Sequence, residues 1–165
     1  MEDILKQLEG ALVANLYYVA LFTALAIPDI AGATDAADGR STRTTYAKWY
    51  DDNMPPEYQS WLDGAGCYNF RCSMLHQGSA QAQNPAAPIK RLMFAGRGPM
   101  YMHRCRMNDG VILDLETFCR DLIAATRTWQ ARVGSTSLYQ HNSAKFVAVH
   151  PTGIAQYIQG VPVIG

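Results

Sequence analysis

The chain has 165 residues, of which 48% are hydrophobic and 17% are charged, and its 14 basic residues balance 14 acidic ones. This length is that of one ordinary domain, and the apolar content excludes a disordered segment because it is sufficient to offset chain entropy. The zero net charge excludes a histone-like protein that coats nucleic acid through excess positive charge. The charges are uneven, however: residues 1–65 hold ten acids and four bases, whereas residues 66–165 hold four acids and ten bases. Such asymmetry is typical either of a basic binding face or of two parts of a domain that attract each other.

The first apolar run covers residues 11–27 and continues a helical pattern that begins at Ile4. It predicts one helix of about 25 residues, apolar on nearly all sides, that ends at Pro28. A helix of this kind is surrounded by other helices or by a partner subunit. The run approaches the length of a bilayer span, but it contains Asn15 and Thr23, so no membrane partner is expected.

Residues 29–40 are small and polar, which indicates a loop. A second helix should follow, because Ser41 or Thr42 is a favourable N-cap. Pro56 is placed to open a short helix that Gly64 closes.

The segment 66–78 has apolar residues at helical spacing and predicts an amphipathic helix with Arg71 on the edge of its apolar stripe. A loop rich in Ala, Asn and Pro follows over 81–88. Beyond it the hydrophobic period changes, and Asn108-Asp109-Gly110 is a hairpin turn signal. Strands are expected over 89–95, 100–107 and 111–113.

Asp114 is well placed to cap a last long helix over 114–133, and a further strand-like stretch follows at 145–150. Together these elements predict one mainly α domain over residues 1–165, with a small antiparallel β-hairpin or sheet before the last long helix and a strand-like C-terminal tail. Its parts are a helical core over 1–80, a β-hairpin region over 89–113, the helix over 114–133 and an extended tail over 134–165.

Two residues on the last predicted helix of the core, Arg71 and His76, have side chains suited to phosphate chemistry. An arginine, four intervening residues and a histidine near a helix end, with Gly78 after it, resemble the R-x4-6-H motif of the HEPN superfamily. That superfamily consists of small helical-bundle domains found in many prokaryotic RNases and toxins, and the resemblance covers roughly residues 3–80. A second match, from Arg97 to His103, falls in an expected loop and strand and is set aside.

The resemblance implies a homodimer in which two copies of the motif face each other, and a metal-independent endoribonuclease that uses no cofactor. His76 would move the proton of a ribose 2′-hydroxyl, and Arg71 would stabilise the charge that develops on the phosphate. HEPN members commonly carry a polar residue after the arginine, where this chain has Cys72, and Ser73 is expected to serve partly in its place. On an ideal helix Arg71 and His76 point about 140° apart, so the two side chains should converge poorly within one subunit.

A different interpretation makes Arg71 structural. The arginine would pair with an acid of the negative first half, such as Asp38, Asp51 or Asp52, and would hold two helices together. His76 would then be a residue that the macrodipole favours at a helix C-terminus. The chain would be a non-catalytic, dimeric interaction module or nucleotide-binding module.

Two further pairs of arginines have the composition of RNA or phosphate contacts. Arg40 and Arg43 flank hydroxyl residues at an expected helix N-terminus, which is also the composition of an ordinary cap. Arg104 and Arg106 lie near aromatic residues, an arrangement found on nucleic-acid surfaces and equally on the solvated face of a hairpin.

The four cysteines contain no C-x2-C pair, so no metal site is expected. They are most simply reduced thiols, and Glu2 and Asp3 stand where a secretory signal would carry positive charge. A cytoplasmic location is therefore expected. The cysteines are Cys67, Cys72, Cys105 and Cys119.

Overall fold

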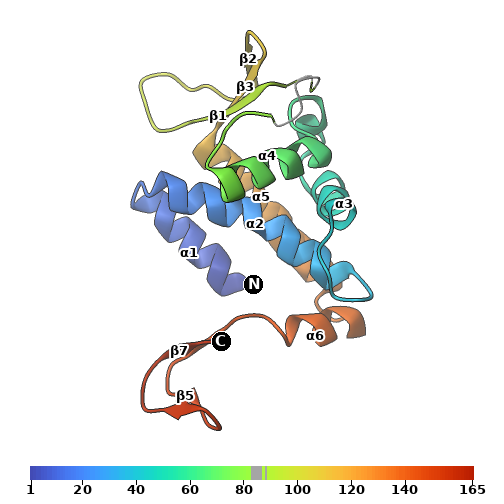
Figure 1. The fold of residues 1–165 in the computed structure, drawn as a ribbon, viewed down its shortest axis with the longest axis vertical. Coiled ribbons are helices and arrows are strands. Elements are labelled where there is room, and N and C mark those ends of the chain that lie inside the picture. The colour runs from blue at the N-terminus through green and yellow to red at the C-terminus, as the bar shows by residue number, and fades with distance from the viewer. Residues whose placement is uncertain (83–86, 88) are drawn as a thin grey trace.

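A computed structural model describes residues 1–82, 87 and 89–165 of the chain, which are mainly helical with small sheets (Figure 1). The helices of this part are α1 (Glu2–Val13), α2 (Tyr17–Asp35), α3 (Arg43–Asn53), the 3-10 helix η1 (Pro56–Ser60), α4 (Gly64–Gln77), α5 (Leu115–Val133) and α6 (Ser137–Ser143). The strands are β1 (Arg91–Ala95), β2 (Cys105–Met107), β3 (Gly110–Asp114), β4 (Val149–His150), β5 (Gly153–Ile154), β6 (Ile158–Gln159) and β7 (Val163–Ile164). The expectation of a mainly α chain is confirmed, and residues 83–86 and 88 of the loop expected over 81–88 lie outside the described residues.

The first apolar run forms two helices instead of the one that its hydrophobicity predicts. The chain leaves α1 at Asn15, whose φ of 57° lies in the left-handed region that asparagine tolerates better than most residues. α2 then continues through Pro28 to Asp35, so the expectations that Pro28 ends the helix and that 29–40 is a loop throughout are wrong. Proline removes one backbone hydrogen bond, but α2 packs against α1, α3, α4, α5 and α6, and this burial outweighs the loss.

Local signals position α3 and α4. Thr42 caps α3 by accepting a hydrogen bond from a backbone N–H of the first turn, as its place in the sequence predicts. Pro56 opens η1, but Gly64 does not close it: Gly64 begins α4, and its backbone lies against Ala47 of α3 too closely for a side chain to fit. α4 ends before Gly78, whose φ of 63° gives a left-handed cap.

The small sheet has the strand order β1-β3-β2 and is mixed. β2 and β3 form the antiparallel hairpin that the turn signal predicts, with Asn108 at a φ of 54°. β1 pairs with β3 in parallel, so the expectation of a purely antiparallel region is wrong. The reason is that residues 96–104 carry the chain past β3 to its other side before the hairpin begins. Only the last three residues of the strand expected over 100–107 are extended, as β2.

The C-terminal tail contains a helix that its composition does not reveal. The sequence predicts an extended tail over 134–165, but α6 forms within it and is capped by Thr136. α6 is held against α2 by Asn142, whose side-chain N–H groups donate to carbonyls at the end of α2. The rest forms two short antiparallel pairs, β4 with β7 and β5 with β6, which project from the helices (Figure 1). Of the strand expected over 145–150, only the last two residues belong to β4.

The core lies where α5 crosses the other helices, and it is rich in aromatic side chains. Trp129 of α5 is fully buried and packs edge-on against Trp49 of α3. The turn between α1 and α2, in contrast, leaves apolar side chains in solvent. These are Val13, Leu16, Tyr17, Tyr18, Val19 and Phe22.

Within the described residues, α2 is the one helix long and apolar enough to cross a membrane when length and composition alone are considered. The core helix of a soluble protein meets the same criterion, and 44% of the apolar window is buried against the rest of the chain. The criterion therefore carries little weight for α2.

Candidate functional site

Arg71 lies on α4, and its guanidinium is paired with a carboxylate of α2. Arg71 Nη2 lies 2.6 Å from Asp29 Oδ2, and the two side chains are only 20% and 18% exposed. The other carboxylate oxygen of Asp29, Oδ1, accepts a hydrogen bond of 2.8 Å from Ser41 Oγ. An acid of the first half does hold Arg71, as the structural interpretation expects, but it is Asp29 and not Asp38, Asp51 or Asp52.

The same guanidinium also reaches His76, which lies near the end of α4. Arg71 Nη1 lies 3.1 Å from His76 Nε2. A guanidinium carries donors only, so Nε2 accepts this hydrogen bond and the neutral imidazole carries its proton on Nδ1. The expectation that the two side chains converge poorly is wrong, because the long arginine side chain bridges the angle of about 140° between the two helix positions.

The cluster keeps Arg71 charged. Burial lowers the pKa of its guanidinium, but the charge of Asp29 and hydrogen bonds to Cys72 and Asp29 outweigh burial, and the net pKa lies above its ordinary value. Cys72 Sγ lies 3.9 Å from Arg71 Nη1, which is a weak contact. His76 is exposed, so the solvent-facing edge of the cluster presents an imidazole beside a charged guanidinium.

Ser73 is not part of this cluster. Its side chain is fully buried, and its Oγ has no hydrogen-bond partner among the described residues. On an ideal helix it points about 200° away from Arg71. The structure thus brings Cys72, and not Ser73, next to Arg71 and His76, so the role expected for Ser73 has no geometric support.

Arg40 and Arg43 are exposed around the start of α3. The backbone N–H of Arg40 donates to Asp38 Oδ1 over 3.1 Å, which stabilises the turn before the helix. Ser41, between the two arginines, is the residue that donates to Asp29. The segment that carries Arg40 and Arg43 therefore borders the Arg71–Asp29 ion pair.

Arg104 and Arg106 lie at the sheet and do not join the Arg71–His76 cluster. Arg106 Nη2 donates to the Ser60 carbonyl over 3.2 Å, and its guanidinium lies 5.5 Å from the centroid of the Trp61 ring. Arg104 is half-buried and has a φ of 55°. Contacts with η1 thus account for the position of Arg106.

A second histidine, His103, belongs to a hydrogen-bonded chain that sequence reasoning did not find. His103 Nδ1 accepts a hydrogen bond of 3.1 Å from the Asp114 N–H, so the neutral ring carries its proton on Nε2. His103 Nε2 lies 3.5 Å from Tyr58 Oη, and Tyr58 Oη donates to Asp121 Oδ2 over 2.8 Å. Partial burial and then the charge of Arg104 lower the pKa of His103. Burial and then the hydrogen bond to Asp121 raise the pKa of Tyr58.

Asp29 is the residue of the Arg71 cluster that sequence reasoning missed. Pro28, directly before it, indicates a helix end, and this interpretation removes Asp29 from the helix. No local signal restores it, because the continuation of α2 past Pro28 depends on the helices that pack around α2. Tyr58 and Asp121 also have no local signal, since they are 63 positions apart.

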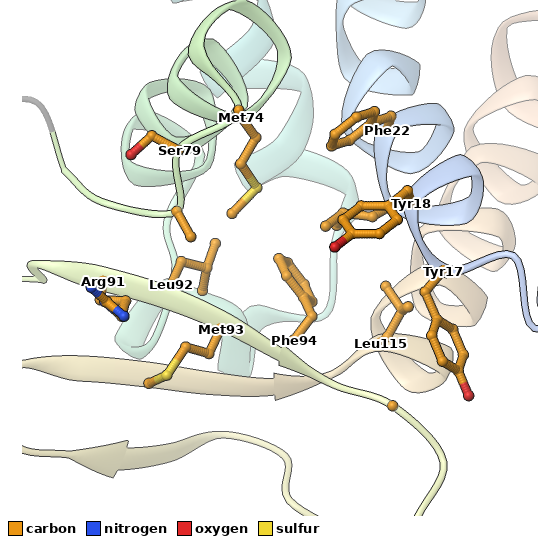
Figure 2. Close-up of a pocket in the computed structure, with 14 residues that line it drawn as sticks. Tyr17, Tyr18, Phe22, Met74, Ser79, Arg91, Leu92, Met93, Phe94 and Leu115 are labelled. Carbon is orange, nitrogen blue, oxygen red and sulfur yellow. The ribbon is translucent and has the colours of Figure 1, made fainter.

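A groove of about 450 Å³ lies between α2, the end of α4 and β1 (Figure 2). Tyr18 and Phe22 of α2 lie across it from Leu92 and Phe94 of β1, and Met74 extends into it from α4 (Figure 2). Its apolar lining includes Tyr18, Phe22, Met74, Leu92, Phe94 and Leu115.

Among the described residues, no group of three or more His, Cys, Asp and Glu side chains is arranged to hold a metal ion. The chain matches no family model, and the searches of curated proteins and of solved structures find nothing similar to it. Its function is therefore argued from the geometry of the cluster formed by Arg71, His76 and Asp29.

Proposed function

We propose that this chain is a HEPN-like protein that cleaves RNA without a metal ion, at the Arg71–His76 cluster, as a homodimer. The observation that carries the proposal is the distance of 3.1 Å between Arg71 Nη1 and His76 Nε2 on the solvent-facing side of α4. It joins a permanent cation to an imidazole, a side chain that can act as general base or general acid, and phosphodiester cleavage requires both functions.

Cleavage in this proposal begins when an RNA phosphate competes with His76 for the guanidinium. Arginine binds phosphate oxygens through paired donors, so the phosphate displaces the imidazole and frees the lone pair of His76 Nε2. His76 then takes the proton of the adjacent 2′-hydroxyl, whose oxygen attacks phosphorus while Arg71 stabilises the developing charge. The bond from phosphorus to the 5′ oxygen breaks, that oxygen receives a proton, and the products carry a 2′,3′-cyclic phosphate and a 5′-hydroxyl.

Asp29 is a positioning residue in this mechanism. Its carboxylate holds Arg71 Nη2 at 2.6 Å, which leaves Nη1 directed at His76. Ser41 in turn donates to Asp29, so the carboxylate is itself fixed in place. Without Asp29 the long arginine side chain would sample several rotamers, at a cost in conformational entropy each time it bound phosphate.

The homodimer in the proposal supplies a second copy of the motif. Cleavage needs a base and an acid, and two subunits that meet at a two-fold axis provide one imidazole for each. Three exposed apolar side chains at the turn between α1 and α2 lie outside the groove lining and support a contact with a second subunit: Val13, Leu16 and Val19. The four cysteines are free thiols, which suits the reducing cytoplasm that we propose as its location.

A second candidate function is favoured by the ion pair itself. The contact of 2.6 Å between Arg71 and Asp29, with both side chains about four-fifths buried, is also what a purely structural arginine would show. In that case α4 is tied to α2, and the chain is a non-catalytic dimeric interaction or nucleotide-binding module. The two candidates differ in whether Arg71 and His76 are needed for cleavage.

The experiment is cleavage of a 5′-labelled single-stranded RNA in the presence of EDTA by the natural protein, His76→Ala and Arg71→Ala. His141→Ala is the matched control, because His141 is an exposed histidine on α6 outside the cluster. We expect cleavage by the natural protein and by the control, with a cyclic phosphate at the new end, and its loss in the other two. Equal activity in all four proteins, or no cleavage by the natural protein, would rule out the enzyme and leave the structural function.

A further inference from the structure

The groove between α2 and β1 displays aromatic rings that the fold does not need for its core. Tyr18 is 78% exposed and Phe22 is 37% exposed. They lie one helical turn apart on α2, and their ring centroids are 6.2 Å apart with the planes inclined at 56° (Figure 2). Exposed aromatic rings at the mouth of an apolar groove form a surface on which another flat ring can stack.

The groove lies along the seam between α2 and α4 that also holds the Arg71–Asp29 ion pair. On α2, Phe22 and Asp29 are seven residues apart and so share one face of the helix. On α4, Met74 lines the groove and lies three residues from Arg71, which is about one turn. An extended ligand that lies along this seam would therefore reach both the aromatic rings and the guanidinium, which are about two turns of α2 apart.

The charges of the groove fit an anionic ligand with an apolar, flat part. Arg91 is the one charged residue among the described residues that line it, and no carboxylate is among them. Its volume of about 450 Å³ falls in the range of sites for small organic ligands. Proteins that bind single-stranded RNA combine aromatic rings that stack on bases with cations that contact the backbone.

We propose that this groove binds unpaired nucleobases that adjoin the phosphate held by Arg71, with Tyr18 and Phe22 as the stacking surface. The substrate class is then single-stranded RNA, because bases in a duplex are stacked on each other and unavailable to the rings. This inference rests on the proposed function, since it assumes that the backbone of the same RNA reaches Arg71.

The test measures binding of two fluorescein-labelled 12-nucleotide RNAs by anisotropy: an oligoadenylate, and an abasic oligonucleotide with the same sugar-phosphate backbone. His76→Ala serves as the background protein so that the RNA stays intact. We expect Tyr18→Ala to weaken binding of the oligoadenylate about ten-fold, the effect of one base stacked on one aromatic ring, and to leave the abasic oligonucleotide unaffected. Tyr18→Phe keeps the ring and should bind as the background protein does.

Tyr157→Ala is the matched control, because Tyr157 is 84% exposed in the C-terminal tail, outside the groove. If Tyr18→Ala binds both oligonucleotides as well as the background protein does, the groove does not bind bases, although RNA binding at Arg71 stands. If instead it weakens both RNAs equally and converts a sedimenting dimer to a monomer, the rings form a subunit contact and the inference is overturned. Failure of the background protein to bind either RNA would overturn this inference together with the proposed function.

Discussion

His103 and His76 are held by the protein in opposite ways. His103 is half-buried, and both of its ring nitrogens are occupied: Nδ1 accepts from the Asp114 N–H and Nε2 faces Tyr58 Oη. His76 is exposed, and among the described residues the hydrogen bond of its ring is the one between Nε2 and Arg71 Nη1. A histidine with both nitrogens occupied has no lone pair or N–H to offer to a ligand, whereas one with an exposed ring can contact a ligand from solvent. His103 therefore contributes to the stability of the fold, and His76 is the histidine that the proposed function uses for proton transfer.

The largest expected effect is on activity and belongs to His76. His76→Ala should lower the rate of RNA cleavage by about 100-fold or more, because a positioned proton-transfer group contributes 10²–10⁴-fold. Its free energy of unfolding should change by less than about 0.5 kcal/mol, since the side chain is exposed. Cleavage assays and urea unfolding of the same preparations measure both quantities. A variant that loses stability and activity in parallel would contradict the division of roles.

The next largest effect is on stability and belongs to the chain of hydrogen bonds around His103. Tyr58→Phe removes the hydroxyl that donates to the Asp121 carboxylate, and hydrogen bonds to charged groups contribute about 1.5–3 kcal/mol. We expect a loss of about 2 kcal/mol in the free energy of unfolding, with cleavage unaffected while the protein remains folded. Tyr101→Phe is the matched control, because Tyr101 is an exposed tyrosine beside the same histidine. An equal loss in both variants would show that Tyr58 Oη has no special importance.

A smaller effect separates the two interpretations of Arg71. Asp29→Asn removes the charge that holds Arg71 but keeps a side-chain oxygen that can accept from its guanidinium, so we expect a loss of about 1–2 kcal/mol in stability and a reduced, measurable cleavage rate. Arg71→Ala leaves the Asp29 carboxylate without its partner, so it should abolish cleavage and cost at least as much stability. Urea unfolding and metal-free cleavage rates of both variants provide the comparison. If the two variants cleave RNA equally well, Arg71 acts only through its ion pair.

Features encoded within a few residues were predictable from the sequence. Thr42 and Asp114 are N-caps, and each accepts a hydrogen bond from a backbone N–H only three residues further along the chain. The hairpin of β2 and β3 likewise depends on the short turn at Asn108. The arginine and histidine of the candidate site could be named because they match a short sequence motif, and both lie on α4.

Features decided by tertiary packing were not predictable. Pro28 stays inside α2 because other helices surround it, and Asp29 therefore reaches Arg71 from a segment that composition assigns to a loop. α6 is held in place because the side chain of Asn142 donates hydrogen bonds to carbonyls at the end of α2, more than 100 positions away in the sequence. Contacts between residues so far apart produce no periodic pattern in a single sequence. The hydrogen bonds that join His103, Tyr58 and Asp121 were not predictable for the same reason.

The smallest expected effect is the pH dependence of stability that His103 confers. Its pKa is lowered from 6.5 in the folded chain, first by burial and then by the charge of Arg104, so the unfolded chain binds the proton more tightly. Stability should therefore be full above about pH 6.5 and should decline as the pH falls below it. Protonation would also place an N–H on Nδ1 opposite the Asp114 N–H, two donors that cannot bond. Urea unfolding between pH 7.5 and 5.5 measures this dependence, and the free energy of unfolding of His103→Gln should decline less with falling pH than that of the natural protein. His141→Gln changes an exposed histidine and should decline as the natural protein does. Identical declines in all three proteins would exclude His103 as the source.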